Sequence, residues 1–250
     1  MKLSISRIKL FKSCRRAYEL KYVHGLEPVE KAESLQTGTS YHEKLEQLYT
    51  DGSFDIDLTK ESAMACAYQK YIYPKFKCHK AEAWCEYKLM SGDVLIGRVD
   101  GIADDGRLVE HKTTSAEITE EYEYNLQWDE QILAYMLMTG AREIYYTVCR
   151  KPTIRQKKDE TEDEFFDRMV EWYDTETESK IRLLRISRTD EEIERFLDAV
   201  EKMACEINHT DHFYRNTNHC RHWGRMCEYA PICMNYDPGQ EYIGFTKEDR

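Results

Sequence analysis

The chain has 250 residues, which is enough for one well-buried core or at most two small domains. Hydrophobic residues make up 41% and charged residues 33%, with 11 Gly and 5 Pro, so we expect an ordinary globular protein without low-complexity tracts. No apolar run of about eighteen residues is present, which argues against a membrane span. The start, MKLSISRIKLFKSCRRAY, alternates basic and apolar residues. It does not look like a secretion signal, so we expect a cytoplasmic protein of a bacterial or phage-infected cell.

The net charge of −11 is unusual for a protein that binds nucleic acid. The charge is unevenly distributed, however. Acidic residues concentrate in Glu117–Glu130 and Asp159–Glu178, and basic residues gather in Lys9–Lys21, Arg142–Lys158 and Arg182–Arg188. Local positive potential is therefore available, although charge alone favours a protein without a nucleic-acid partner. The candidate site must decide between the two.

The N-terminal part is predicted to be helical, and three short strands follow it. We expect a first helix from Ser4 or Ser6 to about Tyr22, a second after Gly38, and a third over Glu61–Tyr73. The strands are expected at Ala83–Met90, Val94–Ala103 and Leu108–Lys112.

The second half alternates between helices and strands. Helices are predicted at Leu126–Thr139, closed by Gly140, at Glu160–Tyr173, and from an Asp190 cap to about Asn208; strands are predicted at Glu143–Cys149 and Ile181–Ile186. The pattern predicts a mixed α/β fold whose helical N-terminal part packs on the core and whose C-terminal segment folds back.

Two neighbouring strands carry a pair of carboxylates. Asp100 lies in the segment GRVDGI, and Glu110 follows about ten residues later in VEHK. Alternation along the second strand places Glu110 and Lys112 on one face, with His111 opposite. Two adjacent carboxylates repel each other, and a hard divalent cation compensates them. Lys112 could then orient water or stabilise phosphate charge. An exposed hairpin with solvated charges would give the same short pattern.

Other residues strengthen the case for a metal site. His42 follows Gly38 by four residues, and its imidazole could add a nitrogen ligand, although a surface histidine is the plainer alternative. Glu86, on the preceding strand, is favoured as a further acidic member over an exposed glutamate. Gln131 and Tyr135 lie at i and i+4 of the following helix and share one face. A half-buried amphipathic helix would look alike.

In this order, the motifs G-x-x-x-H, G-x-x-D, E-x-K and Q-x-x-x-Y resemble those of the RecB-like branch of the PD-(D/E)XK nucleases. The resemblance covers nearly the whole chain. It implies a restriction-endonuclease-like core in which His42, Asp100 and Glu110 bind Mg²⁺ or Mn²⁺, with the carbonyl of His111 as a fourth ligand. Lys112 would be the catalytic lysine, and Gln131 and Tyr135 would support the DNA and the active site.

Nine cysteines without an export signal argue for metal or cluster ligation rather than disulfides. Cys220, Cys227 and Cys233 crowd into fourteen residues, and Cys14 stands near the other end of the chain. From spacing alone, an iron–sulfur cluster and zinc are about equally favoured, with His219 and His222 as alternative nitrogen ligands.

The family resemblance favours a [4Fe–4S] cluster, because RecB-like exonucleases of the CRISPR-associated and AddB types hold one with an N-terminal cysteine and a C-terminal trio. The six-residue first gap of the trio is similar to that of phage-encoded relatives. The resemblance implies a single nuclease domain over 1–250, with 1–25 and 205–250 as the cluster-binding part and 80–150 as the catalytic core.

We therefore expect a metal-dependent DNA exonuclease that acts on single strands or duplex ends in recombination, repair or phage DNA processing. Two alternatives are an inert iron–sulfur or zinc DNA-binding accessory protein, and a zinc-stapled protein unrelated to nucleic acid. No G-x-x-x-x-G-K-[ST] motif is present, so unwinding would need a helicase or recombinase partner. Polarity, strand preference and assembly into a homo-oligomer stay open.

Overall fold

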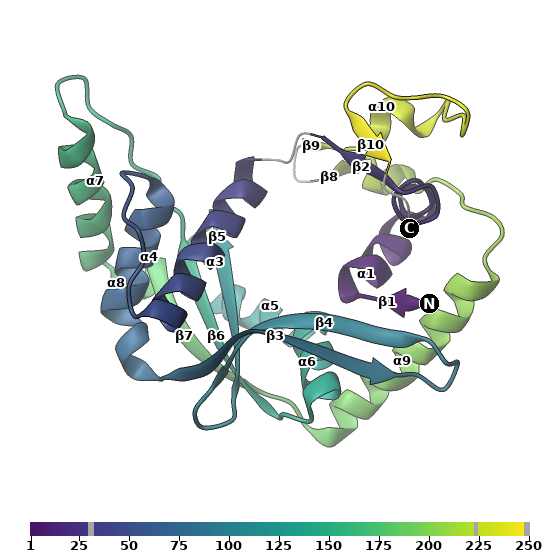
Figure 1. The fold of residues 1–250 in the computed structure, drawn as a ribbon, viewed down its shortest axis with the longest axis horizontal. Coiled ribbons are helices and arrows are strands. Elements are labelled where there is room, and N and C mark those ends of the chain that lie inside the picture. The colour runs from purple at the N-terminus through teal and green to yellow at the C-terminus, as the bar shows by residue number, and fades with distance from the viewer. Residues whose placement is uncertain (30–32, 223–224, 248–250) are drawn as a thin grey trace. The chain divides into compact units, whose positions relative to one another are not determined.

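The computed structural model describes residues 1–29, 33–222 and 225–247, without the side chains of 33–35 and 222 (Figure 1). The chain forms two compact units. The terminal unit comprises Met1–Ala32, Tyr87–Ile96 and Leu197–Arg250, and the central unit comprises Glu33–Glu86 and Gly97–Phe196. Each unit is described by itself below.

A mixed sheet forms the centre of the central unit. Its strands are β3 (Cys78–Lys88), β4 (Val94–Ala103), β5 (Leu108–Thr114), β6 (Glu143–Arg150) and β7 (Ile181–Ser187). Neighbouring strands in the sheet follow this order. The pairs β4–β5 and β6–β7 are antiparallel. Strands β5 and β6 are parallel, and their register runs from Leu108 opposite Ile144 to Thr114 opposite Arg150. The predicted mixed α/β fold with a central mixed sheet flanked by helices is confirmed.

Strict alternation along β5 and β6 supplies two hydrophobic cores, one on each face of the sheet. Val109 and Tyr145 pack with Tyr41 of α3 (Glu33–Asp51) and Tyr68 of α4 (Lys60–Tyr71). On the opposite face, Leu108, Ile144, Tyr146 and Val148 pack with Ile132, Tyr135 and Met136 of α6 (Glu130–Thr139). The sheet is therefore covered on both faces, which is why β6 is buried from Ile144 to Cys149.

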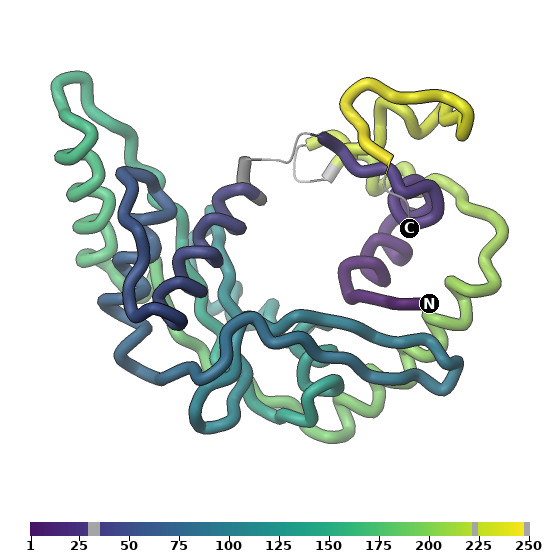
Figure 2. Tube along the Cα trace, in the orientation of Figure 1, coloured from purple at the N-terminus to yellow at the C-terminus, as the bar shows by residue number. Residues whose placement is uncertain are grey.

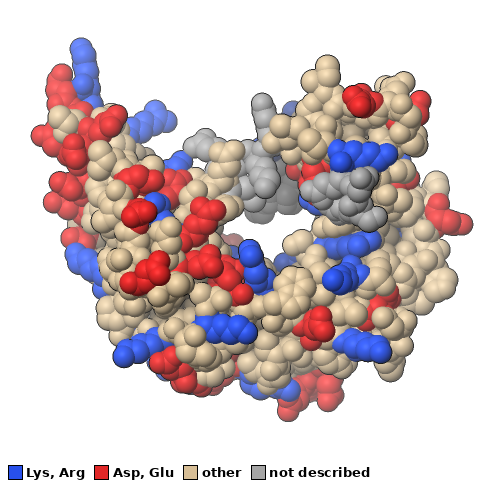
Figure 3. All heavy atoms as spheres, viewed as in Figure 1, with Lys and Arg blue, Asp and Glu red and all other residues tan. Residues whose placement is uncertain are grey.

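Shorter helices complete the central unit. These are α5 (Glu120–Asn125), α7 (Glu162–Glu171) and α8 (Thr177–Lys180). A capping box between Thr161 and Glu164 starts α7, and Phe166 and Met169 pack it against Ala63 of α4. The solvent face of α7 is acidic, and red side chains gather over it in Figure 3. This face therefore carries a negative potential that disfavours the approach of anions.

The terminal unit joins the two ends of the chain. It contains β1 (Lys2–Leu3), α1 (Ile5–Ser13), α2 (Arg15–Tyr18), a π-turn over Glu19–Val23, β2 (Leu26–Pro28), most of α9 (Asp190–His209), β8 (Arg221–His222), β9 (Arg225–Met226), α10 (Ala230–Cys233) and β10 (Phe245–Lys247). β10 pairs with β2, so the first and last segments lie side by side, as the purple and yellow traces of Figure 2 show. β1 pairs in parallel with the start of β4.

Several element boundaries differ from the expected ones. The helix predicted to follow Gly38 begins at Glu33, so Gly38 lies inside α3. The predicted first helix is interrupted at Cys14, whose backbone is extended (φ −159°, ψ 109°). The cap of α9 is Thr189 rather than Asp190, because the Thr189 hydroxyl accepts the Glu192 amide at 3.2 Å. Strand β4 has the predicted bounds, whereas β3 begins five residues before the predicted Ala83.

Among the described residues, no helix is long and apolar enough to cross a membrane.

Two glycines offer a matched test of packing. A Cβ at Gly97 would lie 2.9 Å from the Tyr135 ring, whereas one at Gly38, inside α3, would meet only Thr113 Oγ1 at 3.8 Å. We expect Gly97→Ala to lower the free energy of unfolding by about 1–3 kcal/mol. Gly38→Ala should raise it by about 0.5–1 kcal/mol, because alanine favours the helix. Urea unfolding measures both. A Gly97→Ala protein as stable as the wild type would show that the Tyr135 ring is not fixed.

Candidate metal-dependent active site

The two predicted carboxylates lie where strands β4 and β5 part. The last paired residues toward the site are Gly101 and Val109, and Asp100 and Glu110 come one residue further along each strand. Because directly opposed residues of antiparallel strands share a face, both side chains point to the same side. The strand pairing therefore brings together two carboxylates that are ten residues apart in the sequence.

Asp100 is held ionised by two neighbours. Its Oδ2 accepts the main-chain amide of His111 at 2.6 Å, and its Oδ1 lies 3.4 Å from Nδ1 of His42 on α3. Burial alone would raise the pKa of Asp100, but the hydrogen bond and charge of His42, together with His111, outweigh it and hold the pKa at about 2. Asp100 is thus a permanent anion at this position.

Glu110 is the most deeply buried acidic group of the site, with 2% of the residue exposed. One carboxylate oxygen, Oε1, forms an ion pair with the Lys112 ammonium group. The other, Oε2, has no hydrogen-bond partner in the described part of the chain. Burial and the charge of Asp100 raise the pKa of Glu110 to about 8, despite the opposing effect of Lys112. A buried oxygen without a partner is costly, and a cation bound beside it would remove that cost.

A chain of hydrogen bonds fixes Lys112. Its Nζ donates to Gln131 Oε1 at 3.0 Å, Gln131 Nε2 donates to the Tyr135 hydroxyl at 2.7 Å, and that hydroxyl donates to the Arg98 carbonyl at 2.8 Å. Burial would lower the pKa of Lys112, but the ion pair with Glu110 raises it, so Lys112 stays a cation. The Q-x-x-x-Y pair of α6 therefore connects the lysine of β5 to the backbone of β4.

His111 points to the opposite face of β5, as alternation predicts. Its ring is buried beside Tyr49 and Tyr68, and its Nδ1 lies 2.7 Å from Thr147 Oγ1. Burial lowers its pKa to about 3, which keeps the ring neutral. The imidazole cannot reach the carboxylates, so any ligand role falls to the main-chain carbonyl.

The sequence pattern missed one acidic residue. Among the described residues, His42, Glu82 and Asp100 form the one group of three or more potential ligands whose ligand atoms all lie within 4.8 Å of one another. Glu82 is on β3, where we expected Glu86 to contribute; Glu86 is exposed and is not part of this group. Burial and the charge of Asp100 raise the pKa of Glu82.

The central unit thus brings together the side chains of most of the predicted site: His42, Asp100, Glu110, Lys112, Gln131 and Tyr135. The negative charge of Asp100 raises the pKa values of His42, Glu110 and Lys112. The arrangement can bind a hard divalent cation and place an ammonium group beside it, as phosphodiester hydrolysis requires.

The four predicted cysteines meet in the terminal unit. Cys14 lies in the break between α1 and α2, and Cys220, Cys227 and Cys233 come from the C-terminal segment. All four line one cavity of about 220 Å³, whose wall is otherwise largely apolar, with Ala17, Met226 and Tyr229. Burial raises the pKa of Cys227 and Cys233, and the neighbouring Cys14 raises each further.

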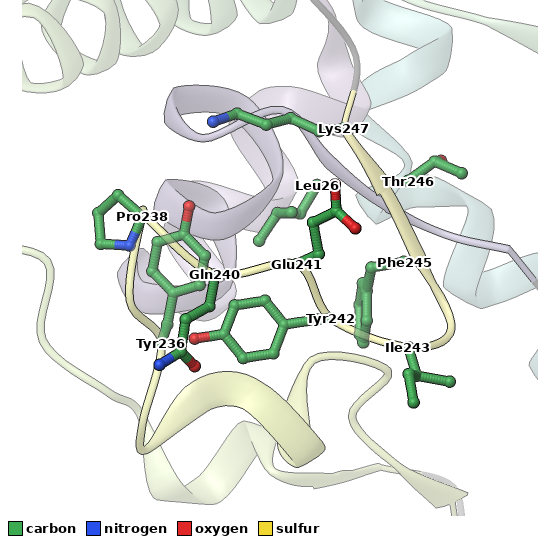
Figure 4. Close-up of a pocket in the computed structure, with 10 residues that line it drawn as sticks. All are labelled: Leu26, Tyr236, Pro238, Gln240, Glu241, Tyr242, Ile243, Phe245, Thr246 and Lys247. Carbon is green, nitrogen blue, oxygen red and sulfur yellow. The ribbon is translucent and has the colours of Figure 1, made fainter.

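A larger cavity of about 610 Å³ lies elsewhere in the terminal unit, between β2 and the C-terminal segment (Figure 4). Tyr236 and Tyr242 form one wall, with ring centroids 5.5 Å apart. Its charged lining residues are Glu241 and Lys247, so it lacks the paired carboxylates of a metal site. Size alone therefore does not mark the reactive centre of this protein.

The chain matches the PD-(D/E)XK nuclease superfamily over residues 2–72 and 58–234. It therefore belongs to this superfamily, whose members use divalent metals.

Among solved structures, the chain is similar to a candidate exonuclease from Eubacterium rectale, with 15% identity, a TM-score of 0.56 and 94% of each chain covered. It is also similar to a phage-related exonuclease from Haemophilus somnus 129PT (14% identity, TM-score 0.39, 73% of this chain and 89% of that one). A third is the alkaline exonuclease of Laribacter hongkongensis (16%, 0.36, 83% and 90%). The likeness to the Eubacterium rectale protein concerns the fold. A search of curated proteins found no match.

Cation binding should depend on pH through Glu110. Because its pKa is raised to about 8, Glu110 carries a proton below that pH, and a cation must displace it. We expect Mn²⁺ affinity to rise from pH 6 to 8 by up to about tenfold per unit, and then to level off. Calorimetry in buffers of different ionisation enthalpy would measure the released protons. Glu110→Gln should reduce this release without abolishing it, because Asp100 raises the pKa of His42 as well, and the His42 imidazole must also lose a proton to bind the cation. A wild-type affinity that does not change with pH would contradict the protonation of Glu110.

Proposed function

We propose that this protein is a Mg²⁺- or Mn²⁺-dependent DNA exonuclease that hydrolyses phosphodiester bonds of single strands or duplex ends. One observation carries the proposal. A buried carboxylate oxygen of Glu110 has no partner in the described part of the chain, beside the ionised Asp100 and the Lys112 ammonium group. Recombination, repair and phage DNA processing are the settings that fit such an activity.

The donor set fits a hard cation. His42, Asp100 and Glu110 would hold it, with the main-chain carbonyl of His111 as a fourth ligand. A cation bound there supplies Lewis-acid stabilisation of the phosphate charge and makes a bound water more acidic. The protein's own part is to hold these ligands in place, and the two strands and α3 that carry them pack into the two cores of the central unit.

Lys112 acts on the phosphate as a fixed point charge. Its ammonium group is anchored by Glu110 and Gln131, so it can orient the attacking water or stabilise the charge that develops on the phosphate. Tyr135 and Gln131 are positioning residues, because they contact Lys112 and the β4 backbone. Such preorganisation matters because the site need not rearrange during the reaction.

The nuclease proposal predicts the loss of activity in conservative variants. Asp100→Asn and Lys112→Gln should each lower the cleavage of end-labelled single-stranded DNA by at least about a hundredfold, and EDTA should abolish it. Glu86→Gln is the matched control, since Glu86 is exposed on β3 and should keep full activity. Shortening from one labelled end would show exonuclease action and reveal its polarity. A folded wild type without cleavage in either metal would favour the inert accessory protein.

We also propose that Cys14, Cys220, Cys227 and Cys233 hold a [4Fe–4S] cluster. Four thiolates at a buried site require cationic compensation, and these four line one cavity. A [4Fe–4S] cluster takes four cysteine thiolates, and the number of these cysteines and the cavity that they share fit such a cluster.

Zinc is the alternative metal that the same cysteines could bind. His219 lines the cavity and could replace one thiolate in a three-cysteine site, whereas the side chain of His222 lies outside the described part of the chain. A protein-bound iron–sulfur cluster is coloured whereas a zinc site is colourless, so visible absorbance separates the two proposals.

Anaerobically purified protein should be brown, with absorbance near about 400 nm and about four iron atoms per chain. Cys220→Ala should remove the colour and the iron, because one ligand of four is lost. Cys205→Ala is the control, since Cys205 is exposed on α9 and outside the cavity. A colourless wild type that contains one zinc per chain would contradict the cluster.

A further inference from the structure

Glu82 has an unusual backbone for its place in the fold. It lies within β3, an eleven-residue strand, yet its φ is +50°. Glu82 and Glu176 are the two non-glycine residues with positive φ in the described part of the chain, and Glu176 is at a helix start. Such a conformation is strained for a residue with a Cβ and persists where the surroundings enforce it. Strain of this kind often marks a functional residue.

The carboxylate of this strained residue lies close to two potential ligands. One of its oxygens lies within 4.8 Å of ligand atoms of both His42 and Asp100. The three residues come from α3, β3 and β4, and 18% of the Glu82 side chain is exposed. An imidazole nitrogen and two carboxylate oxygens are a suitable donor set for Mn²⁺ and similar divalent ions.

Arg98 neutralises Glu82 in the cation-free site. Its Nε lies 2.6 Å from Glu82 Oε2, and 65% of the Arg98 side chain is exposed. The guanidinium group therefore caps the cluster from the solvent side. A divalent cation at His42, Glu82 and Asp100 would compete with Arg98 for the same carboxylate. Once released, an exposed guanidinium beside the site is well suited to bind a phosphate group.

We propose that Glu82 is a further ligand of the divalent cation, and that cation binding frees Arg98 to bind a phosphate of the nucleic-acid strand. This inference rests on the proposed cation-dependent nuclease activity. It assigns two new roles: a strained ligand on β3, and an arginine whose contribution to binding appears only when the cation is present. Ligation and substrate binding would then be coupled through a single carboxylate.

The experiment measures Mn²⁺ affinity without nucleic acid, by electron paramagnetic resonance of the free ion, on the full-length protein. Glu82→Gln should weaken binding at least about tenfold, as the loss of a ligand does. Arg98→Gln should strengthen binding, because the competing cation is gone. Glu86→Gln, four residues further along β3, should match the wild type.

Glu82→Gly separates a ligand from a structural residue. Glycine adopts positive φ without strain, so this variant should be at least as stable as the wild type in urea while its Mn²⁺ affinity falls. Wild-type affinity in both Glu82 variants, or weaker Mn²⁺ binding in Arg98→Gln, would overturn the inference.

Nucleic-acid binding tests the role of Arg98. In a Lys112→Gln background, which blocks turnover, Arg98→Gln should weaken the binding of a single-stranded oligonucleotide in Mn²⁺ but not in EDTA. An equal loss of oligonucleotide binding in Mn²⁺ and in EDTA would contradict the release of Arg98 from Glu82 by the cation. If the wild type neither binds Mn²⁺ nor cleaves, the nuclease proposal fails as well; if it does both while the Glu82 variants keep wild-type affinity, only the present inference fails.

Discussion

The central unit is organised around the burial of two adjacent carboxylates. Asp100 and Glu110 lie where β4 and β5 part, and each raises the cost of ionising the other. Asp100 is compensated by His42 and by a main-chain amide, whereas Glu110 has one oxygen paired with Lys112 and one without a described partner. The protein alone thus leaves the pair incompletely neutralised. The same imbalance, which would destabilise an ordinary core, would provide a driving force for the cation binding that we propose.

Rigid elements on both faces of the sheet sustain this arrangement. One core, with α3 and α4, positions His42 and encloses the neutral His111; the other, with α6, positions Gln131 and Tyr135 behind Lys112. Tyr135 also closes over Gly97, where a side chain would displace its ring. Tyr135 therefore serves both the packing of the unit and the hydrogen-bond chain to Lys112. Gly97, the glycine of the G-x-x-D motif, is required because the Tyr135 ring occupies the space that a side chain would need.

Local pattern predicted much of the fold and most of the site. Alternation gave β4 its bounds and placed Glu110 and Lys112 on one face, opposite His111. Helical spacing placed Gln131 and Tyr135 together, as their hydrogen bond requires. These features depend on neighbours within a few residues. The break at Cys14 is accompanied by hydrogen bonds from Asn216 to Cys14 Sγ and to the Ser13 carbonyl, which are tertiary contacts that a local pattern does not reveal. The start of α3 before Gly38 was also missed by the sequence pattern.

Glu82 shows where prediction from sequence fails. Glu82 and Glu86 are four positions apart, so alternation places both side chains on the same face of a regular strand. Which of the two reaches His42 and Asp100 depends on the pairing of β3 with β4 and on a backbone angle that glutamate rarely adopts. Neither has a local sequence signal.

The acidic character of the protein is consistent with a nucleic-acid substrate once the site is considered. In the proposed nuclease, the acidic residues Glu82, Asp100 and Glu110 lie beside the position of the phosphate, and α7 presents a further acidic surface. On our proposal, this potential would repel a nucleic-acid strand from the site when no cation is bound. A bound cation would neutralise the ligands, and Lys112 and Arg98 would then supply positive charge to the phosphate. A protein with a net charge of −11 would thus recruit a polyanion at one place and release it elsewhere, because its affinity would be concentrated at the metal.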